Sequence, residues 1–402
     1  MTPPPSRSAD GLRGLPDTQR SMRRRNLARV MHAVSAEGPL SRAAVAASTG
    51  LTRAAVSTLV DDLVRWDLLE EYGPGRPPAA GRGRPGSALA VSDRGPVGIG
   101  AEIGVDHLAV CAVDLRGTVR ARAELRGANR GRPPETVLAD LALRVRRVVE
   151  ECGGRGLWPA GLAVAVPGLV ARDSRILDRA PNLGWPRTDL GALLPGAPPL
   201  SVDNEANYGG LAELWLDPGA PRDFLHVSAE IGIGAALVVD GRLLRGTHGF
   251  AGELGHVPVH PDGPACRCGG SGCLERYAGE DAVLRAAGLD PGEGRSSLLA
   301  ERAARGDRTA LRALRGAGTA LGIALAGAVN LLDPRAVVVG GELAALAPWV
   351  LPPLEEELSR RTGGRDCPVS ASRLGKEGPL LGAAHSVVRA VLDDPACVTE
   401  RS

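Results

Sequence analysis

Aromatic side chains and lysine are both scarce in this chain of 402 residues. Phe, Trp and Tyr together make up only 2% of the residues, so Ala, Leu and Val have to fill the core. Lys376 is the only lysine among 48 basic residues, and the rest are arginine. This bias toward arginine points by itself to no function.

Other absences exclude whole classes of protein. No uninterrupted apolar run approaches the length of a membrane-spanning helix. The first twenty residues lack the apolar stretch of a secretory signal peptide. The seven cysteines are an odd number, which argues against a framework of disulfides and favours a reducing compartment. We therefore expect a chain of two or three domains that resides in the cytoplasm and has no membrane partner.

Charge is unevenly distributed along the chain, although the formal net charge is only +2. Residues 1–95 contain 14 arginines against nine acidic residues, whereas residues 96–402 contain 34 basic against 37 acidic residues. A basic head on a near-neutral body indicates that the head contacts nucleic acid.

Residues 21–95 carry the pattern of a winged helix-turn-helix domain, after a Pro-rich segment, 1–20, that we expect to be a disordered tail. Apolar residues at helical spacing predict a helix that ends near Gly38. Ser41 and Thr52 can cap two further helices, and a tight turn lies between them at Gly50. Two strand-like segments, 68-LLEEY and 88-ALAVS, follow and would flank the wing.

The expected DNA contacts lie near the start of each capped helix and in the wing. Their side chains suit phosphate and base-edge contacts in the major groove, and the Arg-Gly-Arg-Pro of the wing suits a narrow minor groove. These residues are Arg42, Thr52, Arg53, Ser57, Thr58, Arg82 and Arg84. The alternative is a small helical bundle followed by a solvated basic linker.

Residues 96–402 alternate predicted strands and helices, which indicates an α/β fold. Strand-turn-strand openings recur near residue 97 and near residue 224, and we interpret them as two similar lobes. The domain boundaries are therefore expected near residues 20 and 95.

The segment 253-ELGHVPVHPDGPACRCGGSGCLE-275 concentrates possible metal ligands. One imidazole and three thiolates would form a closed tetrahedral zinc site with no position for a reactive water, so the metal would be structural. The four ligands are His256, Cys266, Cys268 and Cys273. Two alternatives are a set of reduced thiols without metal, and His260 in place of His256.

Several motifs of the body resemble those of the ROK family (repressor, open reading frame, kinase). They are 180-APNLGW, 202-VDNEAN, 246-GTHGFAGELGH, 266-CRCGGSGCLE and 338-VVGGEL, in the order of that family. The resemblance implies an α/β body of two actin-like (ribonuclease H-like) lobes around a sugar cleft, and the head resembles the winged helix-turn-helix of the repressor branch. It also implies zinc at the four ligands above and a sugar pocket lined by Asn182, Asn204, Glu205, Glu253, His256 and Glu275.

The phosphate-binding positions distinguish a repressor from a sugar kinase. Kinases of the ROK family carry Asp-x-Gly-Gly-Thr in the first hairpin, where this chain has Val105 and Asp106 in place of the second Gly and the Thr. A branched side chain and two further carboxylates, at 106 and 230, disfavour a polyphosphate. Glu205 replaces the aspartate base of the kinases, so its geometry for proton abstraction is in doubt.

We therefore expect a sugar-responsive transcriptional regulator without kinase activity, most plausibly a repressor of carbohydrate-use genes. Its partners would be operator DNA, a sugar or sugar-phosphate effector, and further copies of itself in a homodimer or homotetramer. The alternatives are a ROK-type sugar kinase that phosphorylates a hexose with ATP, and a regulator that responds to no small molecule.

Overall fold

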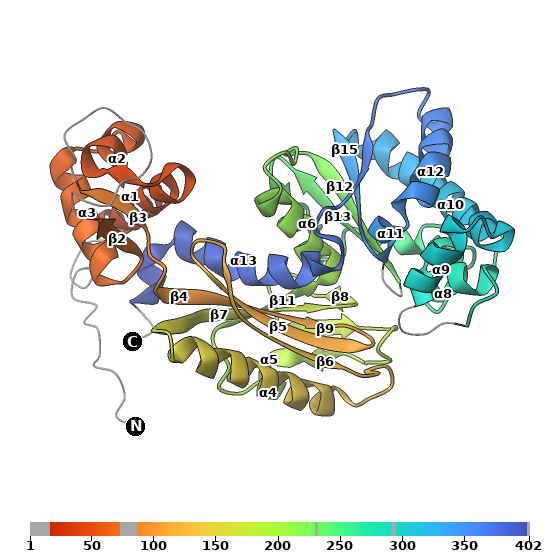
Figure 1. Cartoon of the computed structure of the whole chain (residues 1–402), viewed down its shortest axis with the longest axis horizontal. Helices are drawn as coiled ribbons and strands as arrows, with labels where there is room; N and C mark the ends of the chain where they lie inside the picture. Colours follow the sequence, from red (N-terminus) through yellow and green to blue (C-terminus); the bar gives the residue numbers. More distant parts are fainter. Residues whose placement is uncertain (1–16, 73–86, 230–231, 291–294, 400–402) are drawn as a thin grey trace.

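The structure is a computed structural model that describes residues 17–72, 87–229, 232–290 and 295–399, arranged as a head and two lobes (Figure 1). The head contains α1 (Asp17–Glu37), α2 (Arg42–Thr49) and α3 (Arg53–Arg65). Three short strands, β1 (Leu40–Ser41), β2 (Leu69–Tyr72) and β3 (Ala88–Val91), form an antiparallel sheet in the order β1-β3-β2.

Helices α2 and α3 begin at the two predicted caps. The Ser41 hydroxyl accepts the Ala44 amide at 3.1 Å, and the Thr52 hydroxyl accepts the Ala55 amide at 3.2 Å. Gly50 ends α2 with φ at 68°, a left-handed conformation that glycine adopts without steric cost. The predicted helix-turn-helix with its pair of strands is therefore confirmed.

Two details of the head differ from the prediction. Helix α1 begins at Asp17, so residues 17–20 of the expected tail are helical, whereas residues 1–16 lie outside the described part. Strand β1 was not predicted, because two residues are too few to show a strand period. The wing residues Arg82 and Arg84 lie outside the described residues.

Each lobe is built on a five-stranded mixed sheet, and the two sheets have the same topology. The first has the order β11-β7-β4-β5-β6, with β4 (Gly95–Ile103), β5 (His107–Asp114), β6 (Val119–Arg126), β7 (Leu157–Val166) and β11 (Leu200–Asn204). The second has the order β14-β13-β12-β15-β16, with β12 (Phe224–Ala229), β13 (Ile233–Val239), β14 (Arg242–Leu243), β15 (Ala336–Gly341) and β16 (Val369–Ala371).

In both sheets the first three strands form an antiparallel meander, and the fourth and fifth pair in parallel beside the first. The prediction of two similar lobes is confirmed. A small antiparallel sheet, β8 (Leu169–Val170), β9 (Ile176–Arg179) and β10 (Thr188–Asp189), extends the first lobe.

Helices cover the sheets on both sides. Helix α4 (Pro134–Gly153) packs on the outer face of the first sheet, and α13 (Gly378–Asp393) packs on its other face beside α6 (Glu205–Leu216) (Figure 1). On the second lobe, α10 (Arg308–Leu332) packs against α12 (Ala347–Arg361). Helix α10 is long and apolar enough to cross a membrane, but here it is a core helix with one buried face.

Short helices complete the loops. They are α5 (Leu190–Leu193), α7 (Glu275–Ala278), α8 (Glu280–Ala286), α9 (Arg295–Ala304) and α11 (Glu342–Ala345), with the 3-10 turns η1 (Leu254–His256), η2 (Gly375–Glu377) and η3 (Pro395–Val398). The chain leaves the first lobe after β11, builds the second lobe, and returns through η2 to the first lobe as α13.

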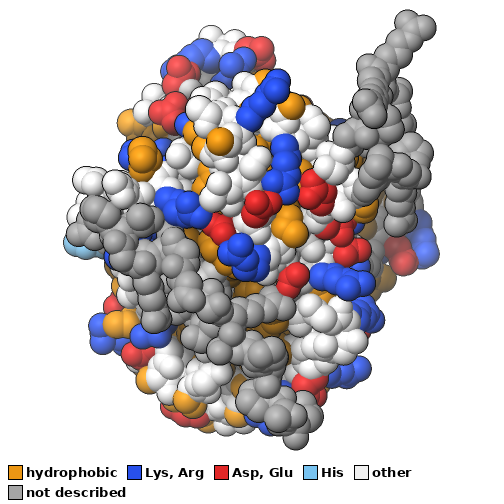
Figure 2. Space-filling model, turned by 90° about the vertical axis from the view of Figure 1, so that its left-hand side faces the viewer, with side chains coloured by type: hydrophobic (Ala, Val, Ile, Leu, Met, Phe, Trp, Pro, Cys, Tyr) orange, Lys and Arg blue, Asp and Glu red, His pale blue; other side chains and the backbone are white. Residues whose placement is uncertain are grey.

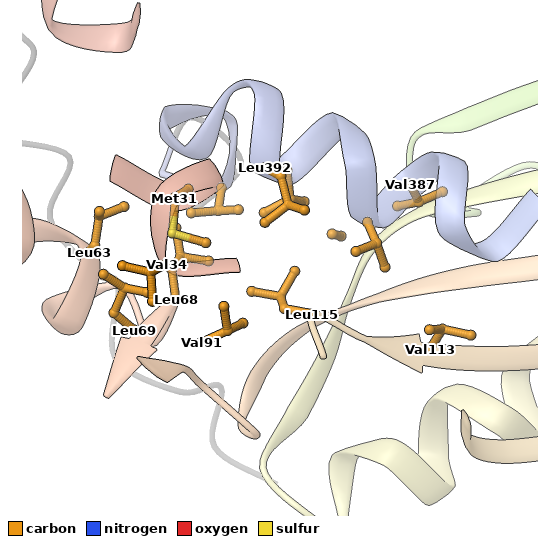
Figure 3. Close-up of a cluster of buried hydrophobic side chains, with 14 of the residues drawn as sticks. Met31, Val34, Leu63, Leu68, Leu69, Val91, Val113, Leu115, Val387 and Leu392 are labelled. Atoms are coloured by element: carbon orange, nitrogen blue, oxygen red, sulfur yellow. The ribbon is translucent and has the colours of Figure 1, made fainter. Parts of the chain in front are cut away.

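The head and the first lobe share one hydrophobic cluster (Figure 3). Met31 and Leu63 of the head lie in the same cluster as Leu115, Val387 and Leu392 of the lobe. Only three residues separate β3 of the head from β4 of the lobe. The head is therefore packed onto the body and does not hang from a long linker.

Candidate DNA interface, metal centre and sugar cleft

Helix α3 presents several of the predicted DNA contacts on its exposed side. Arg53 and Thr58 are exposed, and Ser57 is half-buried. The Thr52 hydroxyl caps the helix as an acceptor, so its proton remains available for donation to a phosphate. Thr52, Arg53, Ser57 and Thr58 therefore lie at the cap and in the first two turns of α3, the second helix of the helix-turn-helix.

Arg42, which we expected to contact DNA, lies differently from the other candidates. Its guanidinium is 2.8 Å from the Asp61 carboxylate on α3 and 3.1 Å from the Glu71 carboxylate on β2. It also donates to the backbone carbonyl of Ser57 at 3.3 Å. The structure thus brings Arg42 together with acidic groups of the head itself.

Much of the positive charge of the head is neutralised within the protein. On α1, Arg23 pairs with Asp62 of the third helix, and Arg24 donates to Asp394 beyond α13 at 2.9 Å. Figure 2 shows the outer side of the head, where basic and acidic side chains are interspersed. The charge count of the sequence therefore overstates the positive charge that these helices can offer to DNA.

The four predicted metal ligands converge at one point. One ligand atom from each of His256, Cys266, Cys268 and Cys273 lies within 4.8 Å of the other three. The sulfur atoms of Cys268 and Cys273 are 3.6 Å apart, close to the ~3.8 Å edge of a tetrahedron with zinc–sulfur bonds of about 2.3 Å. The donor set and its spacing therefore fit a tetrahedral thiophilic ion.

The chemistry of the thiols agrees with this geometry. Burial, together with the two neighbouring thiols, raises the pKa of Cys273 to about 12, whereas the Gly270 amide lowers the pKa of Cys268. A thiol with so high a pKa keeps its proton at neutral pH unless a cation takes the place of the proton. His260 is not in the cluster; its ring packs against the edge of Tyr277, at 5.1 Å between ring centroids.

His256 connects the thiol cluster to the cleft between the lobes. Its Nδ1 faces the sulfur of Cys266 at 3.9 Å, and its Nε2 lies 3.7 Å from the Glu253 carboxylate. A metal on Nδ1 would fix the ring and leave the Nε2–H to donate toward the cleft. One side chain can therefore serve both the metal centre and the ligand pocket.

Residues of the two lobes meet at Gly232, the first described residue after Ala229. A Cβ atom on Gly232 would lie 2.5 Å from the Glu275 carboxylate of the second lobe and 2.7 Å from the Asn182 amide of the first. Gly234 faces Asn204 and Glu205, because a Cβ atom added to Gly234 would lie 3.7 Å from Asn204 Oδ1. The hairpin of β12 and β13 thus borders the pocket on both sides.

The predicted pocket residues Asn204 and Glu205 lie at the start of α6. The Asn204 amide donates to the Gly168 carbonyl at 3.0 Å and to Glu205 at 2.8 Å, while its oxygen caps the helix at the Ala206 amide. Their side chains are half-buried, and both face Gly234, two residues after the glycine that faces Asn182 and Glu275.

Glu253 completes the predicted pocket. Partial burial raises the pKa of Glu253, the nearby Glu275 carboxylate raises it further, and His256 and Arg179 oppose the shift. A carboxylic group with a raised pKa can switch between donating and accepting a hydrogen bond with a hydroxyl. The six predicted pocket residues thus fall into three neighbouring pairs: Asn182 and Glu275 at Gly232, Asn204 with Glu205, and His256 near Glu253.

Sequence reasoning missed two residues of this site. Asp203 is buried and accepts from the Asn204 backbone amide and from Asn207, both at 2.8 Å, and it pairs with Arg245 of the second lobe. Arg179 acts on Glu253 from the strand β9. Asp203 lies inside the motif 202-VDNEAN and could have been found there, but no local pattern marks Arg179.

Comparisons with known proteins follow the division into head and body. The sequence profile of the ROK family matches residues 98–390, and that of the MarR family matches residues 25–82. The chain belongs to the ROK family. The xylose repressor of Bacillus subtilis (strain 168) is 30% identical over 365 residues, which are 88% of this chain and 92% of that protein. The glucokinase of Streptomyces coelicolor is 30% identical over 318 residues, 71% of this chain and 96% of the glucokinase.

Solved structures of the ROK family have the same fold. A ROK family transcriptional regulator, a homologue of the E. coli MLC protein, superposes with a TM-score of 0.76 at 24% identity and covers 94% of this chain and 99% of its own. The ROK family glucokinase of Streptomyces griseus, in complex with glucose and AMPPNP, has a TM-score of 0.61 at 25% identity, with 72% and 98% covered. With its MarR-type segment and actin-like ROK body, this chain has the domain composition of a DNA-binding transcriptional repressor of the ROK family.

The other half of this ROK cleft is rich in carboxylates. Asp106, in the first hairpin, is 2.9 Å from His107, and the carboxylate of Glu102 is buried 3.7 Å from the same ring. On the second lobe, burial and the neighbouring Glu342 raise the pKa of Glu280 to about 7. Lys376 pairs with Glu342, while Glu230 lies outside the described residues.

Proposed function

We propose that a sugar or sugar phosphate, bound between the two lobes, releases this repressor from operator DNA upstream of carbohydrate-use genes. The observation that carries the proposal is the meeting of Asn182 and Glu275, from opposite lobes, at Gly232. A ligand that contacts both lobes binds one lobe arrangement more tightly than another, and so shifts the population toward it. The repressor acts in the cytoplasm, where its operator is.

The proposed assembly is a homodimer or homotetramer that binds two operator half-sites. Heads that dock on two half-sites must keep the spacing of about one helical turn of DNA. Because each head is packed onto a first lobe, a change in lobe angle would alter the spacing of two heads. The six pocket residues are proposed as effector contacts, and Arg53, Ser57, Thr52 and Thr58, with Arg82 and Arg84, as DNA contacts.

We propose further that the chain has no sugar kinase activity. Val105 stands where a kinase exposes bare backbone, and its side chain is buried in the first hairpin. Asp106 and Glu342 act electrostatically on Glu280, so carboxyl groups of both lobes gather here with Lys376 as their nearby cation, and these acidic surroundings disfavour a polyphosphate. Glu205 supplies no positive charge to offset these carboxylates, and it accepts a hydrogen bond from the Asn204 amide.

The effector test uses the full chain and a panel of free and phosphorylated monosaccharides. One of these should raise the melting temperature, because a ligand at 100 times its Kd stabilises the folded state by about 2.7 kcal/mol. The same sugar should weaken binding to a labelled duplex selected from a random-sequence library. The Asn182→Ala and Glu275→Gln variants should lose the response, while Asn330→Ala, at the exposed end of α10, keeps it.

Two results would contradict this function. If no sugar in the panel changes either the melting temperature or the DNA affinity, the effector pocket is not functional. If ATP and a hexose yield ADP and sugar phosphate at an enzyme-like rate, the chain is a kinase.

Zinc is the proposed metal at His256, Cys266, Cys268 and Cys273. When bound it supplies a structural cross-link, because four protein ligands leave no position for a water. We expect one zinc per chain by elemental analysis and none in Cys268→Ser, whose melting temperature should also fall. Cys367→Ser, outside the cluster, should retain zinc. A wild-type chain without zinc, or a Cys268→Ser variant that retains it, would contradict the assignment.

A further inference from the structure

Four polar residues form a continuous network beside the recognition helix, which we call the head brace: Arg42, Asp61, Glu71 and Ser87. Arg42 is the first residue of α2, Asp61 lies on α3, and Glu71 lies on β2. Ser87 is the last described residue before β3, and its hydroxyl donates to Glu71 at 2.5 Å. The brace therefore joins the helix-turn-helix to Glu71 of β2 and to Ser87, which directly precedes β3.

Each guanidinium nitrogen of Arg42 has a partner in this network. Its Nε and one terminal nitrogen donate to the two oxygens of Glu71, at 3.3 and 3.1 Å. The other terminal nitrogen is 2.8 Å from Asp61 and donates to the Ser57 carbonyl at 3.3 Å. All three guanidinium nitrogens thus donate within the head through four of the five N–H groups, so that only one N–H, on the terminal nitrogen that donates to Glu71, remains for another acceptor.

The brace carries a net negative charge. One guanidinium faces the two carboxylates of Asp61 and Glu71, and Asp61 is itself more than half exposed, at 57%. DNA would approach this surface with further negative charge. A group whose only purpose was to attract phosphate would not be surrounded in this way, because the carboxylates cancel its field.

The geometry of the brace distinguishes it from a simple exposed ion pair. The side chains of Arg42 and Glu71 are only 28% and 31% exposed, and their contact is bidentate and part of a network. What a bidentate, planar guanidinium does provide is geometry, because it fixes the directions of two carboxylates at once. The elements that it fixes are α2, α3 and β2, which carry or flank the predicted DNA contacts.

We propose that Arg42 is a positioning residue for DNA recognition and not a DNA contact. It holds the recognition helix α3 at a set distance from the base of the wing, so that both can engage one duplex. The proposal rests on the DNA-binding function of the head and replaces the role expected for Arg42 from the sequence.

Removal of the carboxylate at Glu71 separates this role from simple electrostatics. Glu71→Ala removes a negative charge near the DNA, so charge alone predicts tighter binding, whereas loss of the brace predicts weaker binding. We expect about tenfold weaker binding, because one or two side chains at the interface would then have to be ordered when DNA binds. The probe is a duplex selected from a random-sequence library on the wild-type chain, read by fluorescence anisotropy.

The matched control is Glu70→Ala. Glu70 is the adjacent carboxylate on β2, and it pairs with Arg116 of the first lobe and not with Arg42. This variant removes the same charge from the same strand and should bind DNA as tightly as the wild type, or slightly more tightly. Thermal melting of both variants checks that each is folded.

Two changes at Arg42 give independent readouts. Arg42→Lys keeps the charge but cannot hold two carboxylates, so it should weaken binding as much as Arg42→Gln does. The dependence of affinity on salt should keep its slope in both variants, because no phosphate contact is lost. In Arg53→Gln the slope should fall by about 0.9, as for one lost phosphate contact.

The outcomes divide clearly. If Glu71→Ala binds as tightly as Glu70→Ala, or if Arg42→Lys restores affinity while Arg42→Gln lowers the salt slope, Arg42 contacts DNA and the brace is wrong. If the Arg42→Ala, Glu71→Ala double variant is no weaker than either single variant, the two residues act as one unit, as proposed. A wild-type chain that selects no duplex would overturn the DNA-binding function and not the brace.

Discussion

At the scale of single residues, His226 shows how burial sets chemistry. It lies on β12 with 3% of its surface exposed, and its Nδ1 has no hydrogen-bond partner in the described part of the chain. Two glycines pack closely against the ring. An added Cβ atom would lie 2.7 Å from the ring at Gly209 and 2.6 Å from it at Gly340. Burial lowers the pKa of His226 to about 4.

The pH dependence of stability follows from this shift. In the unfolded chain the histidine has a pKa near 6.5, so the unfolded state binds the proton first as pH falls. The contribution of His226 is therefore complete above pH 6.5 and is lost as pH falls toward 4, by about 2 kcal/mol near pH 5. Glu280, whose pKa is raised to about 7, acts in the opposite direction over the same range, so the loss is measured as the difference between wild type and His226→Gln in urea unfolding near pH 7 and near pH 5.

A variant assigns the effect to this ring. His226→Gln should lose about 2 kcal/mol less than the wild type between pH 7 and pH 5. His385, whose pKa burial and Arg389 also lower to about 4, and Glu280, which acts in the opposite direction, contribute equally to both proteins. His260→Gln, at an exposed loop position, should behave as the wild type. Equal pH dependence in His226→Gln and the wild type would show that His226 is accessible to protons in the folded state.

At the scale of elements, α6 and α13 cross at glycines. A Cβ on Gly382 of α13 would lie 2.0 Å from the Tyr208 carbonyl of α6, and a Cβ on Gly378 would lie 3.6 Å from Gly209. Helix α6 begins at Asn204 and Glu205 of the pocket, and α13 ends beside the head. The close crossing therefore holds together the two helices that reach the pocket and the head.

Gly382→Ala should accordingly destabilise the protein. The added methyl group overpacks a backbone contact, which costs roughly 1–3 kcal/mol. Gly327→Ala is the matched control, because Gly327 is a helical glycine of α10 with no neighbour within 4 Å of its Cβ position. It should stabilise the chain by up to about 1 kcal/mol through helix propensity. Denaturant midpoints measure both; a Gly382→Ala variant as stable as Gly327→Ala would refute the crossing.

At the scale of the whole molecule, head and first lobe form one packing unit. Besides the shared cluster, His32 of α1 is 2.7 Å from Asp393 of α13, and Arg116 donates to the Val91 carbonyl of β3 at 2.7 Å. These contacts span more than three hundred residues of sequence between α1 and α13. In the proposed mechanism, a bound sugar would therefore act on the head through packed helices and not through a linker.

We expect the head and the first lobe to unfold together. Scanning calorimetry should show no separate transition of the head, since its core residues Leu27 and Met31 lie in the same cluster as α13. Met31→Ala should lower the melting temperature of the joint transition by several degrees, because truncating a buried methionine costs about 2–5 kcal/mol. A head that melts first, with the transition of the body unchanged, would contradict this.

Local patterns of the sequence were enough for features whose parts are neighbours in the chain. Ser41 and Thr52 cap helices through amides three residues away, and Cys266, Cys268 and Cys273 lie in one loop. Such features depend on short-range backbone geometry, which residue type and spacing describe well. The ROK motifs also predicted the pocket residues, but they gave no information on how these residues lie relative to one another.

Contacts between distant segments could not be read in the same way. The pairing of Arg42 with Glu71, the meeting of Asn182 with Glu275 at Gly232, and the return of α13 to the head all join residues that only the folded chain brings together. The sequence alone does not show whether an arginine pairs with a phosphate or with a carboxylate. Its partner depends on which surfaces pack together, and that is a property of the complete fold.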